Sequence, residues 1–356
     1  MTAVNQQVLA TRLKISRATV SRCFTNHPGI NPKTRAKVFA LAAKLGYTHF
    51  EKRPETKNGK EPKSLTIGVL VCVDMPNFEG TGYANPGQGL LNGLSDFARG
   101  QNLRLDLHFV QPSDAHLDSP SYAKITGSRR RLWDGVVLIY PFPRTVVDEL
   151  IQKYPLVSLV VQYTDTTLNC VDIDHYRGIS KLIHHLYDKG HRRIGFFTWN
   201  YPVDAGWARR RFCGYVERLS ALGMPLRMED VINIYPAQGL SVQAASERML
   251  QQTKDGVTAW VCAADHQAYE LMEWLQKRGV RVPEDVSIAS FDGLVRPAGS
   301  PLLTTIKIPF HQIGVMGAKR LLDLIERGYD APQQILLDCE LREGTTVAPV
   351  SVKRTH

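Results

Sequence analysis

Residues 4 to 25, VNQQVLATRLKISRATVSRCFT, form two short amphipathic segments joined by a turn. In the first segment, Val8, Leu9 and Leu13 recur at helical spacing and predict a buried stripe, with Ala10 where helices cross closely. Ser16 is a good N-cap for a second helix. One side of that helix would carry Thr19, Val20, Cys23 and Phe24. The other side would carry small and basic residues, namely Arg17, Ala18, Ser21 and Arg22. This arrangement predicts a helix-turn-helix.

A third helix is expected directly downstream. Asn31 would cap it, Pro32 would be its first residue and Gly46 would end it. Apolar residues follow at positions i, i+3, i+4 and i+7, and these are Val38, Leu41, Ala42 and Leu45. Three such helices have enough apolar surface to close a small core, so residues 1–50 are predicted to form a separate domain.

The excess of positive over negative charge is confined to this part of the chain. Residues 1–63 hold 13 Lys and Arg and 3 Glu, a net charge of +10 that equals the charge of the whole protein. The alternative is an ordinary helical hairpin whose basic residues form a solvated face, but such a hairpin would not require so much positive charge in so short a segment. Phosphate contacts supply most of the affinity of proteins for nucleic acids, so the pattern favours a DNA-binding domain.

The string ISRATVSRCF, followed by NPKTRAKVFALAAKLGY, resembles the headpiece of the lactose/galactose repressor family. The family pattern is V-S-x-x-T-V-S-R, then a P-x-T-R helix ending in L-G-Y. The resemblance implies that Arg17 and Ala18 select the operator sequence and that Arg22 contacts guanine, which suits its planar donor fork. It also implies a group of residues near phosphates that fix the register, namely Ser16, Thr19, Ser21, Asn31, Thr34 and Tyr47.

The chain departs from the family pattern twice. Lys14 stands where the family has Gly in the turn, and a left-handed conformation there costs a non-Gly residue roughly 1 kcal/mol. After Tyr47 the family has a short hinge helix whose leucine enters the minor groove. Here the segment is THFEKRPETKNGKEPKS, in which Pro54 disfavours a helix and no leucine occurs before Leu65. Residues 51–64 are therefore predicted to be a flexible basic linker.

The remaining chain has ordinary globular composition, with 43% hydrophobic and 22% charged residues. Its six cysteines are scattered without C-x-x-C spacing, as expected for free thiols in a reducing compartment. The chain opens with a polar helix instead of a signal peptide, and the longest apolar run, residues 65–73, is too short to span a bilayer. We therefore expect a cytoplasmic protein with no membrane partner.

From Leu65 onward, β-rich runs alternate with helical patterns. The expected strands are 65–73, 103–110, 134–142, 155–161, 170–174, 192–198, 231–235, 258–264, 286–292 and 303–308. The expected helices are 88–99, 122–131, 146–154, 176–189, 208–223, 241–251, 266–279 and 312–326. This alternation predicts parallel sheets with helices on both faces, and so many strands suit two lobes. Ligands in such folds bind at the carboxyl ends of strands, here expected between the lobes.

The family resemblance continues through this region. It is carried by VDIDHYRGISKLIHHLYDKGHRRIGFF, RRRFCGY and VPEDVSIASFDG…PLLTTIKIPFHQIG. It implies a two-lobed α/β core like the periplasmic sugar-binding proteins, in which the chain crosses between lobes three times. The effector-binding and dimerisation domain would span 65–356, with lobe 1 at about 65–168 and 309–330 and lobe 2 at about 169–308 and 331–356.

Transfer of the family's effector site gives Arg211, the arginine of R-x-x-G, and Asp292, the first acid of the family's F-D-D motif, here followed by Gly293. Asp74 and Asp265 are weaker candidates, and Trp199 is chosen to stack on a sugar, with Trp207 behind it. Carboxylates and a planar arginine can each hold adjacent hydroxyls. The alternatives are a surface ion pair or a helix cap, notably for Asp265, and a structural role for Asp174 at a lobe crossing.

Other motifs do not support a different chemistry. Residues 82–87 have P-loop-like spacing but lack the Lys and Ser/Thr that hold phosphate. His184, His185 and His191 have no Cys or acidic partners at ligand spacing, so no metal is expected, and no cofactor either. No coherent catalytic constellation is present, so an enzyme is not expected.

These features predict a transcription regulator, most simply a repressor, that binds a partly palindromic operator as a homodimer. A small molecule, expected to be a sugar, would enter between the lobes and change headpiece placement, so that half-site spacing no longer fits. Without a hinge helix, coupling is expected through headpiece placement. The alternatives are a cytoplasmic sugar receptor whose headpiece contacts protein, and a sugar-processing enzyme on the same fold.

Overall fold

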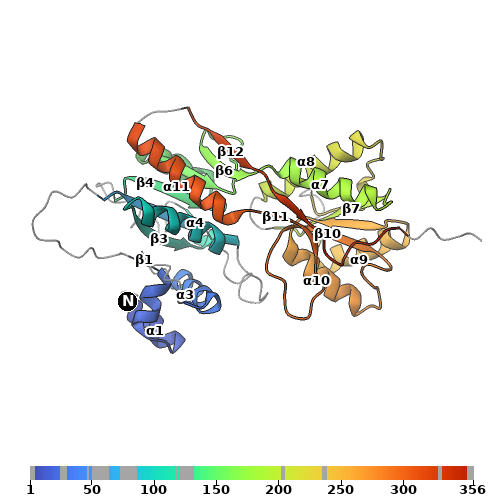
Figure 1. Cartoon of the computed structure of the whole chain (residues 1–356), viewed down its shortest axis with the longest axis horizontal. Helices are drawn as coiled ribbons and strands as arrows, with labels where there is room; N and C mark the ends of the chain where they lie inside the picture. Colours follow the sequence, from blue (N-terminus) through green and yellow to red (C-terminus); the bar gives the residue numbers. More distant parts are fainter. Residues whose placement is uncertain are drawn as a thin grey trace, which may run out of the picture. The chain divides into compact units, whose positions relative to one another are not determined.

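The computed structural model describes most of the chain (Figure 1). The described residues are 5–24, 30–45, 48–49, 64–72, 86–116, 119, 132–201, 205–234, 239–327 and 331–350. They divide into two compact units. Unit 1 comprises Met1–Thr81, Asn85–Asp172 and Phe310–Ile335, and unit 2 comprises Gly82–Ala84, Ile173–Pro309 and Leu336–His356.

Unit 1 begins with the headpiece, the predicted three helices. They are α1 (Gln6–Leu13), α2 (Arg17–Phe24) and α3 (Pro32–Lys44). Asn5 caps α1, and Ser16 caps α2 by accepting a bond from the Thr19 amide at 3.0 Å. The shared core is fully buried and consists of Leu9, Ala10, Val20, Cys23, Val38 and Ala42. Lys14 ends α1 in the left-handed conformation, with φ 53°, as its position in the turn predicts.

The sheet of unit 1 has the strand order β1-β3-β2-β4-β5-β6-β12. The strands are β1 (Thr48–His49), β2 (Thr66–Cys72), β3 (Arg104–Val110), β4 (Gly135–Ile139), β5 (Leu156–Leu159), β6 (Asn169–Ile173) and β12 (Gln334–Leu337). The strands from β3 to β6 pair in parallel, whereas β1 lies antiparallel on the outer edge of β3. Nearly continuous apolar burial of β2 and β4 reflects helices on both faces.

In the part of unit 1 that the structure describes, three α-helices flank this sheet, and η1 (Pro112–Asp114) is a short 3-10 turn after β3. The α-helices are α4 (Pro86–Gly100), α6 (Arg144–Lys153) and α11 (Phe310–Arg327). Helices α4 and α11 lie side by side in close contact (Figure 1), because glycines replace side chains where they cross. A Cβ on Gly93 would lie 1.9 Å from the His311 carbonyl oxygen, and one on Gly314 would lie 2.2 Å from that of Leu90. Helix α6 instead packs Val146 into a separate apolar cluster with β2 and β4.

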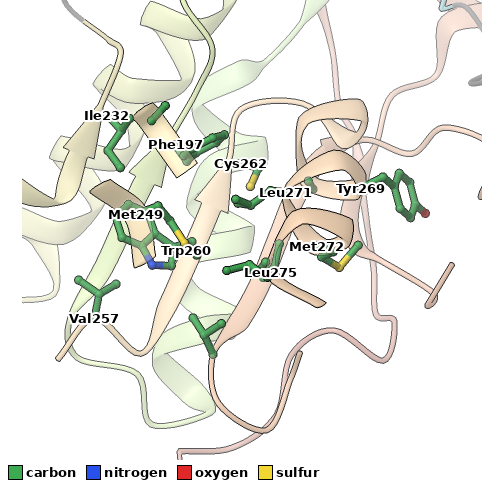
Figure 2. Close-up of a cluster of buried hydrophobic side chains, with 14 of the residues drawn as sticks. Phe197, Ile232, Met249, Val257, Trp260, Cys262, Tyr269, Leu271, Met272 and Leu275 are labelled. Carbon is green, nitrogen blue, oxygen red and sulfur yellow. The ribbon is translucent and has the colours of Figure 1, made fainter. Parts of the chain in front are cut away.

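Unit 2 is a second sheet with the order β13-β11-β10-β9-β7-β8. Its strands are β7 (Ile194–Phe197), β8 (Val231–Ile232), β9 (Ala259–Cys262), β10 (Ser287–Asp292), β11 (Thr304–Lys307) and β13 (Glu340–Arg342). Its helices are α7 (His175–Asp188), α8 (Gly206–Ala221), the 3-10 turn η2 (Met228–Asp230), α9 (Val242–Lys254) and α10 (Asp265–Gln276). Trp260 and Met249 lie in the core that α9 and α10 cover (Figure 2).

The fold class agrees with the predicted headpiece and α/β core, with differences at short elements. The short edge strands β1, β12 and β13 were not expected from the sequence. Residues 331–356 were assigned to lobe 2, whereas β12 pairs within the first sheet. The expected helix 122–131 lies outside the described residues. So do residues 51–63 of the expected linker 51–64. No helix in the described part of the chain has the length and apolarity needed to cross a membrane.

Candidate functional site

The headpiece presents a small basic face on α2. Arg17, Ala18 and Arg22 are exposed, whereas Val20 and Cys23 on the same helix are fully buried. The hydroxyls of Ser16 and Thr19 lie 2.8 Å apart at the start of the helix, so both are placed by the cap. The predicted reading residues therefore share one exposed surface that can meet a groove of DNA.

Most of the residues predicted to lie near phosphates are in the described part of the headpiece. Asn31 is exposed at the start of α3, and Thr34 is half-buried one turn into that helix. Ser21 is half-buried on α2. Tyr47 lies outside the described residues, so its expected position near phosphate stays a prediction.

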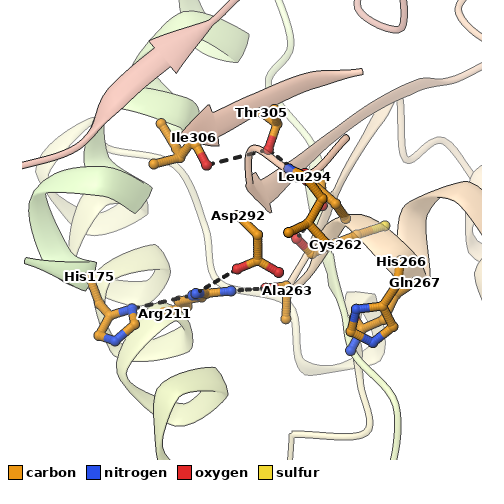
Figure 3. Close-up of polar contacts among 12 residues, drawn as sticks. His175, Arg211, Cys262, Ala263, His266, Gln267, Asp292, Leu294, Thr305 and Ile306 are labelled. Carbon is orange, nitrogen blue, oxygen red and sulfur yellow. Dashed lines mark hydrogen bonds and ion pairs between the residues drawn. The ribbon is translucent and has the colours of Figure 1, made fainter. Parts of the chain in front are cut away.

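In unit 2, Arg211 is the centre of a buried polar cluster (Figure 3). Its side chain is only 4% exposed. The guanidinium donates to the Ala263 carbonyl, to Asp292 Oδ1 at 3.0 Å and to His175 Nδ1 at 3.3 Å. Because His175 accepts that bond, its Nδ1 carries no proton in this arrangement. These partners come from α7, β10 and the end of β9, so the sheet topology brings them together.

Two aromatic rings lie against the guanidinium of Arg211. Its central carbon lies 4.0 Å from the ring centroid of Phe291 and 4.7 Å from that of Trp207. Such stacking favours a desolvated guanidinium. Trp207 therefore contacts Arg211 directly, whereas the sequence analysis placed it behind Trp199.

Asp292 ends β10 in an unusual backbone conformation. Its φ is 128°, and Gly293 follows with φ 69°. A Cβ on Gly293 would lie 2.6 Å from Lys307 Cα, so the turn needs glycine. Burial raises the pKa of Asp292 to about 6 although Arg211 acts to lower it. Strained backbone next to a buried carboxylate is typical of a ligand-binding position.

Asp265 is the first residue of α10 and is 1% exposed. Its Oδ1 accepts a hydrogen bond from the Thr305 hydroxyl at 2.6 Å, and its Oδ2 accepts one from the Leu294 amide at 2.8 Å. Burial first, and the charge of Asp292 second, raise its pKa to about 7. Asp265 thus fastens β11 and the turn after β10 to α10, so it positions Asp292.

A second group of side chains lies beside these residues and consists of Trp199, Tyr201, His266 and Gln267. The sequence analysis identified Trp199 as a candidate site residue but not the other three. Gln267 Nε2 donates to the Tyr201 hydroxyl at 2.5 Å, so that hydroxyl is oriented to donate to His266 Nε2 at 3.0 Å. Burial, with Arg211 as a second cause, lowers the pKa of His266 to about 4 and keeps the ring neutral. Trp199 is half-buried and meets His266 edge to face at 4.9 Å.

The other candidate residues named from the sequence do not belong to this cluster. Asp174 caps α7 by accepting a bond from the Arg177 amide at 2.9 Å, so it has the structural role that was the alternative. Asp74 lies outside the described residues. Within the described ranges, no group of three or more His, Cys, Asp or Glu side chains could hold a metal. The ring nitrogens of His191 instead bond to Thr258 and to the Ala348 carbonyl.

Two protein-family models match this chain. The model of bacterial regulatory proteins of the lacI family matches residues 9–49, and that of the periplasmic binding protein-like domain matches residues 183–347. A lacI-type headpiece joined to a periplasmic-binding-like α/β core defines a class of transcription regulators. In both of these parts the chain is similar to regulators of the LacI family.

Two curated relatives match along most of their length. The transcriptional repressor CytR of Escherichia coli strain K12 is 29% identical over 96% of this chain and 95% of its own. Catabolite control protein A of Priestia megaterium is 25% identical over 88% of this chain and 90% of its own.

Solved structures share the fold. The CelR–cellobiose complex superposes with a TM-score of 0.65 at 22% identity, covering 96% of this chain and 99% of that chain. The lac repressor dimer bound to operator and the anti-inducer ONPF gives a TM-score of 0.62 at 23% identity, covering 97% and 99%.

Proposed function

We propose that this protein is a sequence-specific transcriptional repressor whose operator affinity is controlled by a small molecule, most simply a sugar. The observation that carries the proposal is the exposed face of α2, on which Arg17, Ala18 and Arg22 lie together above a fully packed three-helix core. Arg22 is the residue assigned to a guanine, because its fork can pair with O6 and N7 in the major groove.

The operator is proposed to be partly palindromic and the protein a homodimer. The lac repressor, whose fold this chain shares, is described as a dimer bound to operator. Two copies of one helix-turn-helix related by a two-fold axis read two inverted half-sites. Ser16, Thr19, Ser21, Asn31, Thr34 and Tyr47 are proposed to lie near phosphates and set the register.

The effector is proposed to bind unit 2 at the carboxyl ends of β9 and β10, against Arg211 and Asp292. A buried carboxylate and an arginine can hold adjacent sugar hydroxyls by charge-assisted hydrogen bonds. Trp199 would supply an apolar stacking surface. Structures of the same fold are described with cellobiose, ribose, glucose and sucrose bound, which supports the ligand class. Asp74 remains a proposed contact, and Asp265 is proposed to act by positioning Asp292.

We propose that this site binds an effector that regulates DNA affinity and does not catalyse a reaction of the bound molecule. The named relatives are transcription regulators, and the buried polar groups of unit 2 pair with one another instead of forming a nucleophile with an adjacent base. A protein with this role acts where the chromosome lies, so the cytoplasm is its proposed location. Incubating purified protein with a sugar panel and finding a chemically altered product would contradict this assignment.

A thermal-shift screen of sugars tests the effector proposal. A ligand that binds only the folded state raises the melting temperature as its concentration rises. We expect one sugar or sugar derivative to do so for the wild type and to lose the effect with Asp292→Asn. The matched control is Asp285→Asn, which alters an exposed carboxylate paired only with Arg281. Equal shifts for all three proteins would place the ligand elsewhere.

The same ligand should then change DNA affinity. Binding of a labelled operator duplex is measured by fluorescence anisotropy at fixed salt, with and without the ligand. The factor by which the ligand changes the affinity for operator must equal the factor by which operator changes the affinity for the ligand. A ligand that binds at Asp292 and leaves DNA affinity unchanged would separate sugar binding from regulation.

A further inference from the structure

His266 lies at the edge of the unit 2 sheet where the effector is proposed to bind. It is the second residue of α10, which follows β9 along the chain. The neighbouring parallel strand β7 ends at Phe197 and leads to Tyr201. Parallel strands that end together place the residues that follow them at one edge of the sheet. The charge of Arg211 acts on both His266 and Tyr201, so the two rings lie close to this buried guanidinium.

A chain of hydrogen bonds fixes the ring of His266. Gln267 is fully buried, and its Nε2 donates to the Thr198 hydroxyl at 3.3 Å and to the Tyr201 hydroxyl at 2.5 Å. The Tyr201 hydroxyl has a single proton, which is then donated to His266 Nε2 at 3.0 Å. The nitrogen of His266 that faces Tyr201 is therefore an acceptor.

The neutral ring of His266 must then carry its proton on Nδ1. Burial, with the charge of Arg211 as a second cause, lowers the pKa of His266 to about 4, so the ring is uncharged at neutral pH. Within the described ranges, Nδ1 has no hydrogen-bond partner, and it is not sealed from the surface. A buried or half-buried donor is normally satisfied, so Nδ1–H is available to a ligand at this edge.

Trp199 restricts what can approach this donor. Its ring meets that of His266 edge to face, with centroids 4.9 Å apart, and the centroid of the Tyr201 ring lies 6.4 Å from its own. A ligand that accepts from Nδ1 would therefore lie beside an aromatic surface and bury an apolar face there. This suits a ring-shaped molecule such as a sugar, whose C–H face can stack while a ring oxygen or a hydroxyl accepts the hydrogen bond.

His266 and Asp292 make opposite demands on a ligand. An ionised carboxylate only accepts hydrogen bonds, so Asp292 requires a ligand donor. The Nδ1–H of His266 only donates, so it requires a ligand acceptor. Figure 3 shows His266 and Asp292 within one cluster of side chains. Together they would select a molecule that presents a donor at one point and an acceptor at another.

We propose that His266 is an effector-binding residue whose Nδ1–H is a fixed, uncharged donor to an acceptor oxygen or nitrogen of the ligand. Tyr201 and Gln267 are positioning residues, because they act through the ring and set which of its nitrogens carries the proton. The role in effector binding rests on the proposed function, whereas the position of the proton on His266 does not.

Nuclear magnetic resonance of the full-length protein labelled with ¹⁵N-histidine shows which ring nitrogen carries the proton. Long-range ¹H–¹⁵N correlation spectra separate the two neutral forms, and His266→Gln identifies the His266 signals by their loss. We expect the Nδ1–H form of His266 in the wild type, unchanged from pH 5.5 to pH 8. Tyr201→Phe should convert part of it to the Nε2–H form, because nothing then holds Nε2 as an acceptor.

His191 is the internal control in the same spectra. Its ring nitrogens bond to Thr258 and to the Ala348 carbonyl, so its signals should not respond to Tyr201→Phe. A wild-type His266 ring that is charged, or that carries its proton on Nε2, would overturn the proposal. This measurement uses neither DNA nor ligand, so its failure is distinct from failure of the proposed function.

A matched pair of substitutions tests contact with a ligand. Cellobiose, ribose, glucose and sucrose, the ligands named with structures of the same fold, are the probes. Asparagine can place an amide donor near the position of Nδ1, whereas leucine has a similar size and no donor. For a sugar that stabilises the wild type, we expect His266→Asn to bind within about threefold of wild type and His266→Leu about tenfold more weakly.

The melting temperatures of the two His266 variants without ligand show whether the substitutions affect folding, and we expect them to be equal. Equal sugar affinity in the two variants would show that His266 does not donate to the ligand and would overturn the assignment. If none of the four sugars binds, the position of the ring proton in the wild type and in Tyr201→Phe decides the proposal by itself.

Discussion

Arg211 Nη2 lies 3.0 Å from Asp292 Oδ1, and the two side chains are 4% and 10% exposed. A charge pair withdrawn this far from water keeps its favourable energy only while both partners are present, because an uncompensated buried charge is costly. Arg211 also bonds to the Ala263 carbonyl and His175, so one side chain fixes several elements of unit 2.

Replacing Arg211 by Met is expected to destabilise the protein by about 3 kcal/mol, since Asp292 would be left buried without its partner. Denaturant-induced unfolding followed by circular dichroism measures the loss. Arg281→Met is the control, because Arg281 and Asp285 form an exposed pair four residues apart in a turn, and no measurable change is expected there. A stable Arg211→Met protein would show that the pair does not hold unit 2 together.

The two buried carboxylates predict a pH dependence of stability. Burial raises the pKa of Asp292 to about 6 and that of Asp265 to about 7, so the folded state holds protons that the unfolded chain releases near pH 4. Their contribution is therefore complete below about pH 4 and is lost as pH rises through about 6 to 7. Asp265→Asn should flatten the fall in the free energy of unfolding between pH 5 and pH 7.5.

Asparagine is a suitable replacement because its amide can accept from the Leu294 amide and donate to the Thr305 hydroxyl oxygen. Asp285→Asn serves as the control, since that carboxylate has its pKa lowered by Arg281 and should not contribute in this range. An unchanged slope in Asp265→Asn would mean that these carboxylates do not titrate between pH 5 and 7.5.

The close crossing of α4 and α11 predicts a strong effect of one methyl group. Gly93→Ala would place a Cβ 1.9 Å from the His311 carbonyl oxygen, so the helices must separate, and a loss of about 2 kcal/mol is expected. Gly100→Ala on the same helix meets nothing within 4 Å and should be nearly neutral. Thermal unfolding of both variants checks this, and equal melting temperatures would argue against the tight crossing.

Lys14 offers a test of local strain in the headpiece. Its φ of 53° is left-handed, so Lys14→Gly is expected to stabilise the headpiece by up to about 1 kcal/mol. Lys14→Ala removes the same charge but retains the Cβ, and it should give no gain. Hydrogen exchange of the α1 and α2 amides reports headpiece opening separately from the core. Equal protection in the two variants would remove the strain explanation.

Local signals explain why the headpiece could be predicted. The Ser16 cap, the Pro32 helix start and the left-handed Lys14 depend only on neighbouring residues, and all three occur as expected. The strands of the core were also visible as apolar runs. The edge strands β1, β12 and β13 have only two to four residues, too few to show a strand pattern in the sequence.

The candidate site was only partly predictable for a different reason. Arg211 and Asp292 were each indicated by family motifs, and the structure pairs them. Tyr201 and Gln267 carry no motif, and they come together because the neighbouring parallel strands β7 and β9 end at one edge of the sheet. His175 lies in a stretch that carries the family resemblance but was not chosen, and it reaches Arg211 from the first residue of α7. Asp265 was a weaker candidate for ligand contact, with a helix cap as the alternative. Its two oxygens accept hydrogen bonds from Thr305 and Leu294, partners that a sequence cannot show.

The central claim is that α2 reads a specific DNA sequence through Arg22. Selection of duplexes from a random DNA pool at moderate salt, with wild type and Arg22→Ala in parallel, tests it most directly. Arg12→Ala, which removes an exposed charge from α1, controls for general loss of phosphate attraction. We predict that wild type enriches a two-fold symmetric site, that Arg22→Ala relaxes one G·C pair in each half-site, and that Arg12→Ala keeps the site and only weakens binding. Salt-sensitive binding of wild type without any enriched sequence would contradict the account.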